Sequence, residues 1–165
     1  MHGASLLLGL FLPGGCNAAA PASPAAAIVP GNPEETRMWM SVGEHRFTIT
    51  LEDNDAAHAF AALLPLALDM AELNGNEKHA SLPEPLPANA SRPGTIRGGD
   101  LMLYGTDTLV VFYLTFRSSY PYTRLGRVDD PAGLAQALGR RGVRVVFPAN
   151  PEDGAAPARS RGQTP

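Results

Sequence analysis

Hydrophobic and polar side chains alternate along several short segments of this chain, a pattern typical of β-strands with one buried face. The alternation is clearest in residues 45–51. A long apolar run lies within residues 98–128, where two strand-like segments flank a polar link with the composition of a hairpin turn. We expect strands at residues 38–42, 45–51, 66–71, 101–104, 109–114, 125–128 and 143–147.

Two segments show helical spacing instead. Apolar side chains recur at helical intervals after an acidic cap, and Pro65 ends the pattern, which predicts a helix near residues 54–64. A second helix is predicted near residues 131–138, with Asp130 as its cap and Pro131 at its first position. Short strands, two short helices and no βαβ repeat indicate a mainly β fold, a closed antiparallel eight-stranded barrel whose ends the helices plug.

Two longer polar segments are predicted to be loops. Residues 74–93 are turn-prone and then carry proline at alternate positions, which the interior of a sheet does not accept. A loop of this length in a small domain usually covers or lines something. Residues 115–124 combine three aromatic rings with two arginines, and we expect a second loop here.

The N-terminus carries the features of an export segment. Residues 4–12 are an apolar run too short to span a bilayer of about 30 Å, but of the size of a signal-peptide hydrophobic region. Small residues and Cys16 follow, which resembles the lipobox of bacterial lipoproteins, although Pro13 departs from that pattern and no Lys or Arg precedes the run. We predict export to the periplasm or cell envelope through residues 1–22, by lipidation of Cys16 or by simple cleavage. The alternative is a disordered cytosolic extension.

Composition divides the rest of the chain. Alanine, proline, glycine and serine dominate residues 17–33 and 148–165, so these stretches cannot bury enough apolar surface to become ordered. We expect a linker at residues 23–37, one domain at residues 38–147 and a disordered tail beyond it.

The net charge of -3 gives no electrostatic footprint for nucleic acid. A membrane is expected as a partner only through a lipid anchor at Cys16, and the oligomeric state stays open.

Five short blocks follow one another in order across residues 38–147. They are LPL at residues 64–66, ELNGNEK at 72–78, PGTI at 93–96, GDLMLY at 99–104 and YTRLGR at 122–127. Together these blocks resemble the bacterial cyclophilin-like family, and the resemblance implies the eight-stranded cyclophilin-type barrel. It does not imply the prolyl isomerase activity of true cyclophilins, because this chain lacks their Phe-x-Arg and Gln-x-Phe elements and Arg97 echoes them only superficially.

Other chemistry finds little support in the sequence. It has no Gly-x-Ser-x-Gly for a serine nucleophile and no phosphate-binding glycine pattern. Glu72, Glu77 and His79 match no metal-ligand spacing, so we predict neither a metal nor a cofactor.

Two function classes stay open. We favour a module that binds a peptide or a small molecule over a weak or divergent peptidyl-prolyl isomerase, in which an arginine over an apolar pocket would stabilise the twisted amide.

Aromatic side chains between residues 104 and 122 are too many for one barrel core. Alternate side chains of the strand at 109–114 face opposite ways, and a barrel buries only one of these faces unless something covers the other. Either the proline-rich loop and the helices cover the second face, or residues 116–124 overhang it and leave a pocket with aromatic walls and an arginine at its rim. The predicted ligand-binding residues are Tyr104, Phe112, Tyr113, Phe116, Arg117, Tyr120, Tyr122 and Arg124.

Overall fold

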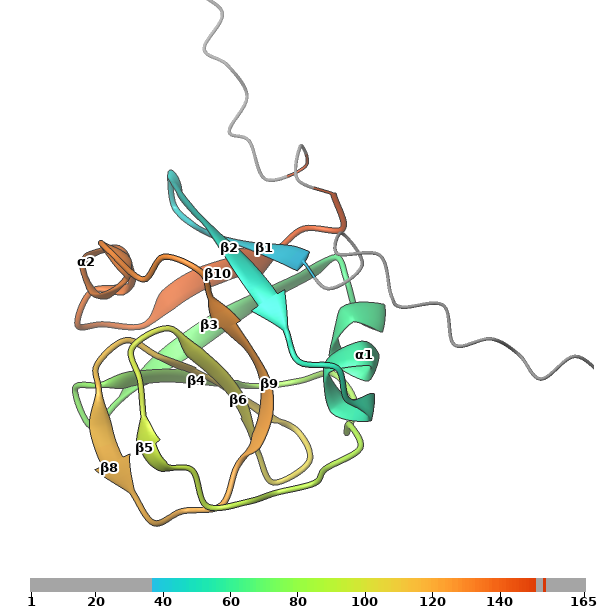
Figure 1. The fold of residues 1–165 in the computed structure, drawn as a ribbon. Coiled ribbons are helices and arrows are strands. Elements are labelled where there is room, and N and C mark those ends of the chain that lie inside the picture. The colour runs from blue at the N-terminus through green and yellow to red at the C-terminus, as the bar shows by residue number, and fades with distance from the viewer. Residues whose placement is uncertain (1–36, 151–152, 154–165) are drawn as a thin grey trace, which may run out of the picture. The chain divides into compact units, whose positions relative to one another are not determined.

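The computed structural model describes residues 37–150 and 153, and within them eight antiparallel strands close into a barrel (Figure 1). In order round the barrel the strands are β1 (Arg37–Val42), β10 (Val143–Phe147), β3 (Leu66–Leu73), β4 (Glu77–Ser81), β7 (Thr108–Phe112), β6 (Asp100–Tyr104), β9 (Thr123–Val128) and β2 (His45–Leu51). The predicted mainly β class and closed eight-stranded barrel are confirmed. The predicted export segment with Cys16 and most of the predicted tail lie outside the described residues.

One hydrophobic cluster fills the interior of the barrel, and alternation along each strand decides which side chains enter it. In β7, Leu109 and Val111 belong to this interior cluster. Val110 and Phe112, between and beside them, belong to a second cluster on the outer face. The barrel therefore has an ordinary core and, on one side, a small second core outside its wall.

The helix α1 (Asp55–Ala62) lies close to its predicted place. The Asn54 side chain caps it by accepting a hydrogen bond from the backbone N–H of Ala57 at 2.9 Å. Phe60 enters the barrel core, where its ring meets that of Phe147 edge to face at a centroid distance of 5.5 Å. The helix thus buries one face and ends before the cis peptide bond at Pro65.

The helix α2 (Leu134–Leu138) is shorter than predicted. Its start is not capped by Asp130, because Gly133, at a φ of 78°, takes up left-handed backbone immediately before the first helical residue. Asp130 instead accepts a hydrogen bond from the backbone N–H of Ala132 at 2.9 Å, within the turn that leads to the helix. Leu134 and Leu138 are buried in the barrel core.

The prediction of one loop over residues 74–93 is wrong at its start, because Glu77–Ser81 is the strand β4. This strand pairs with β3 on one side and β7 on the other, so it is part of the barrel wall. Its buried positions are Glu77 and Lys78, and two charged side chains give no hydrophobic alternation by which the strand would be recognised. The rest of the segment, residues 82–93, contains no helix or strand.

The proline-rich segment after β4 covers an end of the barrel. Leu82 and Leu86 are buried in the barrel core. Their backbone N–H groups donate to the carbonyl oxygens of Asp107 and Thr106, each at 2.7 Å, in the turn between β6 and β7. This part of the segment therefore closes the core and does not cover the outer face of the barrel wall.

The cover over the outer face is a two-stranded ribbon of β5 (Gly94–Ile96) and β8 (Phe116–Ser118). The prediction of a loop throughout residues 115–124 is therefore wrong for β8. Ile96 and Phe116 of the ribbon pack with Met102, Val110 and Phe112 of the wall in the second cluster. The ribbon and the outer face of the wall both contribute apolar side chains to this cluster, which explains the excess of aromatic residues in this part of the chain.

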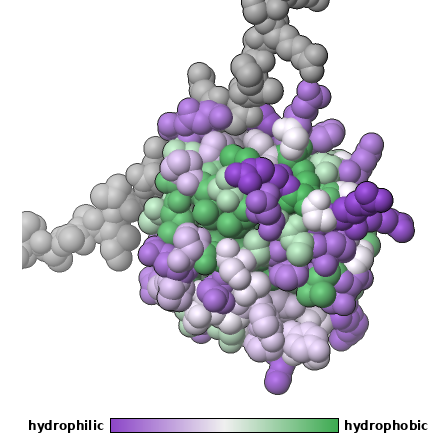
Figure 2. Space-filling view, turned by 180° about the vertical axis from the view of Figure 1, so that it is seen from behind, coloured by the Kyte–Doolittle hydropathy of each residue, from purple (hydrophilic) through white to green (hydrophobic). Residues whose placement is uncertain are grey.

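The surface of the domain carries both hydrophobic and hydrophilic side chains. Seen from behind, apolar side chains gather in one region among hydrophilic ones (Figure 2). Within residues 37–150 and 153, no helix has the length and apolar character needed to cross a membrane.

Candidate functional site

A pocket of about 530 Å³ lies between the β5–β8 side of the domain and the outer face of β4, β6 and β7. Buried side chains, among them Glu77 of β4 and Val110 of β7, form its base. More exposed ones, among them Arg117 of β8 and Tyr120, form its rim. The ribbon covers only part of the outer face of the wall. The pocket lies beside the second cluster, on the part of this face that the ribbon leaves open.

Apolar side chains that face water are concentrated at this pocket. Leu73, Tyr104 and Tyr120 are 43%, 46% and 63% exposed, and all three line it. The fourth large apolar side chain found exposed among the described residues is Leu114, which lies elsewhere. Large apolar groups that stay in water around a concave surface are typical of a binding site.

The rings at the pocket form a continuous packed series. Tyr104 contacts Tyr122 at a centroid distance of 5.6 Å, and Tyr122 meets Phe112 at 5.5 Å. Phe112 in turn contacts Phe116 at 5.6 Å. Phe112 is fully buried and supports the other rings from beneath. These contacts fix the orientation of the rings before any ligand arrives.

Glu77 is a buried carboxylate at the base of this pocket, with a relative exposure of 6%. Burial raises its pKa, the negative charge of Glu72 raises it further, and hydrogen bonding from Asn74 partly opposes both effects. Burial and the Glu77 charge also raise the pKa of Tyr122. Among the described residues, no Lys, Arg or His nitrogen lies within 4.0 Å of the Glu77 carboxylate.

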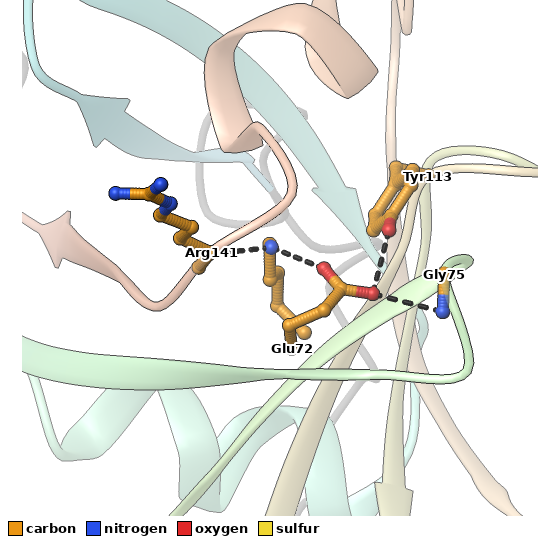
Figure 3. A network of polar contacts seen from close by, with 5 residues as sticks. Glu72, Gly75, Tyr113 and Arg141 are labelled. Carbon is orange, nitrogen blue, oxygen red and sulfur yellow. Dashed lines mark hydrogen bonds and ion pairs between the residues drawn. The ribbon is translucent and has the colours of Figure 1, made fainter.

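Lys78 follows Glu77 in the chain but points into the barrel, because successive side chains of a strand face opposite ways. Its ammonium is fully buried and forms an ion pair with Glu72. It also donates to the backbone carbonyl of Arg141 at 2.7 Å and lies 5.6 Å from the centre of the Tyr113 ring (Figure 3). The lysine is thus satisfied inside the barrel and does not neutralise Glu77.

The Tyr113 hydroxyl completes this interior network. It donates to Glu72 at 2.8 Å, and the backbone N–H of Gly75 donates to the same carboxylate oxygen at 2.9 Å. Burial and the bond to Glu72 raise the pKa of Tyr113 to about 12. Burial alone would raise the pKa of Glu72, but hydrogen bonds from Lys78 and Tyr113 outweigh it, so this pKa is lowered.

The structure brings most of the predicted site residues together but not all of them. Five of the eight line the pocket, and Phe112 lies directly beneath it; the five are Tyr104, Phe116, Arg117, Tyr120 and Tyr122. Tyr113, directly after β7, lies in the interior network instead, because its side chain faces away from that of Phe112. Arg124 lines a different hollow, beside the start of α1.

Arg124 has a structural partner. Its guanidinium lies 3.6 Å from Asp100, a carboxylate that is only 2% exposed. Arg127 approaches the same carboxylate at 3.9 Å, and the backbone N–H of Arg97 donates to it at 2.8 Å. The buried charge of Asp100 is therefore balanced, in contrast to that of Glu77.

Sequence reasoning did not place Glu77, Asn74 or Leu73 in the site. It weighed Glu77 only as a metal ligand together with Glu72 and His79. The signal that identifies this region is the dipeptide Asn74-Gly75, a strong sign of a tight hairpin. Both residues have positive φ, 57° and 73°, and the turn brings β4 back beside β3, with Glu77 facing the pocket.

The acidic and histidine side chains of this region do not form a metal centre. Glu72 points into the barrel, whereas Glu77 and His79 line the pocket on its outer face. Within the part of the chain that the structure describes, no three His, Cys, Asp or Glu side chains are placed to hold one ion. The arrangement offers aromatic walls, one buried carboxylate and an arginine at the rim.

Known proteins resemble this chain in sequence and in fold. A family model described as "Cyclophilin-like family" matches residues 40–147. The solution structure of a hypothetical protein from Archaeoglobus fulgidus aligns at 12% sequence identity and a TM-score of 0.46, covering 70% of this chain and 95% of that one. No curated protein matches the sequence.

Proposed function

The chain belongs to the cyclophilin-like family, and from this premise we propose that its barrel is a binding module that takes a peptide or a small molecule in the aromatic pocket. The observation that supports this most strongly is the exposure of Leu73, Tyr104 and Tyr120 around one hollow. Rigid aromatic side chains give large contact area at little entropic cost, and such residues dominate binding energy in many interfaces.

A ligand screen with matched variants tests the proposal. The full chain is screened by thermal shift against short peptides and metabolites, and binders are titrated by calorimetry. We expect Tyr120→Ala to weaken binding at least about tenfold, because an exposed ring at the rim contributes contact area but little stability. Leu114→Ala removes a similarly exposed apolar side chain away from the pocket and is expected to bind normally. A screen without binders, or equal effects of the two variants, would contradict the proposal.

The second candidate function is prolyl isomerisation, and one observation favours it. Arg117 lines the pocket next to Phe116, so an arginine does lie at an apolar hollow. Such a guanidinium can hydrogen-bond the proline nitrogen as the amide twists and loses conjugation. A protease-coupled assay on an Ala-Pro peptide tests this: activity that Arg117→Ala abolishes supports it, and an uncatalysed rate contradicts it.

The proposal also places the protein outside the cytoplasm, in the periplasm or cell envelope. Its support is in the sequence: the apolar run at residues 4–12, the small residues after it and Cys16. In that setting a binding module would meet exported peptides and extracellular small molecules.

A further inference from the structure

We propose that the aromatic pocket is built to receive an alkylammonium group, with the carboxylate of Glu77 as its counter-ion and the rings of Tyr104, Tyr120 and Tyr122 around it. This inference rests on the proposed function, since it names the chemistry of the ligand for the same pocket. It is independent of the isomerase alternative, which needs no positive charge on the substrate.

The buried charges of the domain carry the first part of the argument. Among the described residues, three charged side chains are buried, namely Glu77, Lys78 and Asp100. Asp100 has two arginines and Lys78 has Glu72. Glu77 has no cation within 4.0 Å in the described part of the chain. A buried carboxylate without a counter-ion is costly, and one that lies in a hollow is a candidate for a functional group.

The walls carry the second part. The face of a tyrosine ring is electron-rich and attracts a cation held within about 6 Å of its centre. Three tyrosines line a pocket that has a carboxylate at its base, and the Glu77 charge is close enough to raise the pKa of Tyr122. Negative potential from the rings and from the carboxylate therefore adds up at the same place.

The interior of the same barrel shows which cation fits such surroundings. The ammonium of Lys78 is held there by a carboxylate, a tyrosine ring and a backbone carbonyl (Figure 3). On the other side of β4, the pocket offers a carboxylate and tyrosine rings, with the side chain of Asn74 beside them. The surroundings of the Lys78 ammonium, next to Glu77 in the chain, therefore resemble those that we propose for the ligand ammonium.

Arg117 is also a pocket residue, and its position limits the ligand. It belongs to β8 and is exposed, whereas Glu77 is buried, so the positive charge lies at the rim and the negative charge at the base. A ligand would therefore direct its ammonium inward and place a carbonyl or carboxylate toward Arg117. A lysine side chain on a peptide satisfies both requirements, whereas a simple free amine satisfies only the first, and the test separates them.

The test compares ligands of equal shape and different charge. The full chain is titrated by calorimetry with acetyl-Ala-Lys-Ala-amide, with the same peptide carrying norleucine in place of lysine, and with n-butylammonium. We expect the lysine peptide to bind at least about tenfold more tightly than the norleucine peptide, because only the former neutralises Glu77. Glu77→Gln should abolish this preference, and Glu84→Gln, an exposed carboxylate in the proline-rich segment, should retain it.

The pH dependence of binding is a second readout that needs no variant at Glu77. Lowering the pH should weaken binding of the lysine peptide, because Glu77 gains a proton while the ligand ammonium stays charged. Glu72 lies behind the wall, and the other titratable or charged groups at this site are His79, Tyr104, Tyr120, Tyr122 and Arg117. His79 is a second ionisable side chain of the pocket, so His79→Gln is measured in parallel and should keep the loss of affinity.

The outcomes distinguish this inference from the proposed function. Equal binding of the lysine and norleucine peptides, or a lysine preference that survives Glu77→Gln, overturns the ammonium site but leaves a binding pocket. If neither these probes nor any library compound binds, both fall. Binding of n-butylammonium as tight as that of the lysine peptide indicates a free amine, and much weaker binding indicates a peptide side chain.

Discussion

At the scale of single residues, the charge of Glu77 sets a trade-off between stability and binding. Its pKa is raised in the folded protein by burial and by Glu72. The protonated form is therefore favoured by folding, and the stability that it contributes is present at low pH and is lost as the pH rises through the folded pKa. At neutral pH an ionised Glu77 opposes folding, as is common for residues kept for function.

Replacing this carboxylate should stabilise the protein. We expect Glu77→Gln to raise the melting temperature by a few degrees near neutral pH and to have no effect below the ordinary pKa of a glutamate. Thermal unfolding at several pH values, with Glu84→Gln as the exposed control, measures this. A destabilised Glu77→Gln at neutral pH would show that the carboxylate has a structural partner.

The interior ion pair should respond unequally to removal of its two partners. Glu72→Gln leaves the ammonium of Lys78, which is fully buried, without its counter-charge, and should cost about 3 kcal/mol. Lys78→Met leaves Glu72 one-fifth exposed and still bonded to Tyr113 and Gly75, and should cost less than half as much. Urea unfolding of both variants measures the difference. Equal losses, or a double variant no more stable than Glu72→Gln, would contradict this account.

The same network predicts a pH limit to stability. The pKa of Glu72 is lowered, so the stabilisation by its contacts is present at neutral pH and is lost as the pH falls through that pKa. Tyr113 has its pKa raised to about 12, so its contribution is lost only in strong alkali. Lys78→Met should flatten the acid side of a plot of melting temperature against pH.

At the scale of elements, periodicity identified the strands that have an apolar face and missed those that do not. Strand β2 alternates cleanly, and α1 has a capped apolar face, so both were predictable. Strand β4 was not, because its buried positions carry the charged side chains Glu77 and Lys78, which give no apolar alternation. The three-residue strands β5 and β8 are too short for a periodic pattern, and pairing with each other defines them.

The junction of β2 and β9 depends on a glycine. A Cβ on Gly126 would lie 2.6 Å from the carbonyl oxygen of Thr50 on the neighbouring strand, which is closer than any contact allows. Gly126→Ala should therefore push the strands apart and cost about 1–3 kcal/mol in urea unfolding. Gly142→Ala is the control, because its nearest contact, to the carbonyl of Met70, is 3.4 Å. Equal effects of the two changes would contradict the steric explanation.

At the scale of the whole molecule, the family blocks and the strand count predicted the barrel, but neither predicted what covers its outer face. Of the two alternatives, the overhang by residues 116–124 is nearer to the structure, since β8 belongs to the covering ribbon. The aromatic half of the pocket was predictable from the surplus of rings. Its acidic half was not, because it depends on the strand order that brings β4 beside β7.

Export of the whole chain is a separate prediction. Expressed in a bacterium that processes lipoproteins, the protein should be cleaved within residues 1–22 and recovered from the cell envelope. Mass spectrometry of the native protein measures the cleavage site. Cys16→Ala should release it from membranes if lipid anchors it there, and should leave it unchanged if cleavage alone occurs. An intact N-terminus in the cytosol would contradict export.

The tyrosines of the chain allow the most direct test of the binding pocket. Of the four, Tyr104, Tyr120 and Tyr122 line it, and Tyr113 lies in the interior network as an internal control. The full chain is labelled with fluorotyrosine, its fluorine NMR signals are assigned by single Tyr→Phe changes, and each ligand from the screen is titrated in. We predict that the three pocket signals shift together while that of Tyr113 stays in place. Ligands that shift Tyr113 alone, or that bind without shifting any pocket tyrosine, would contradict the assignment of this pocket as the binding site.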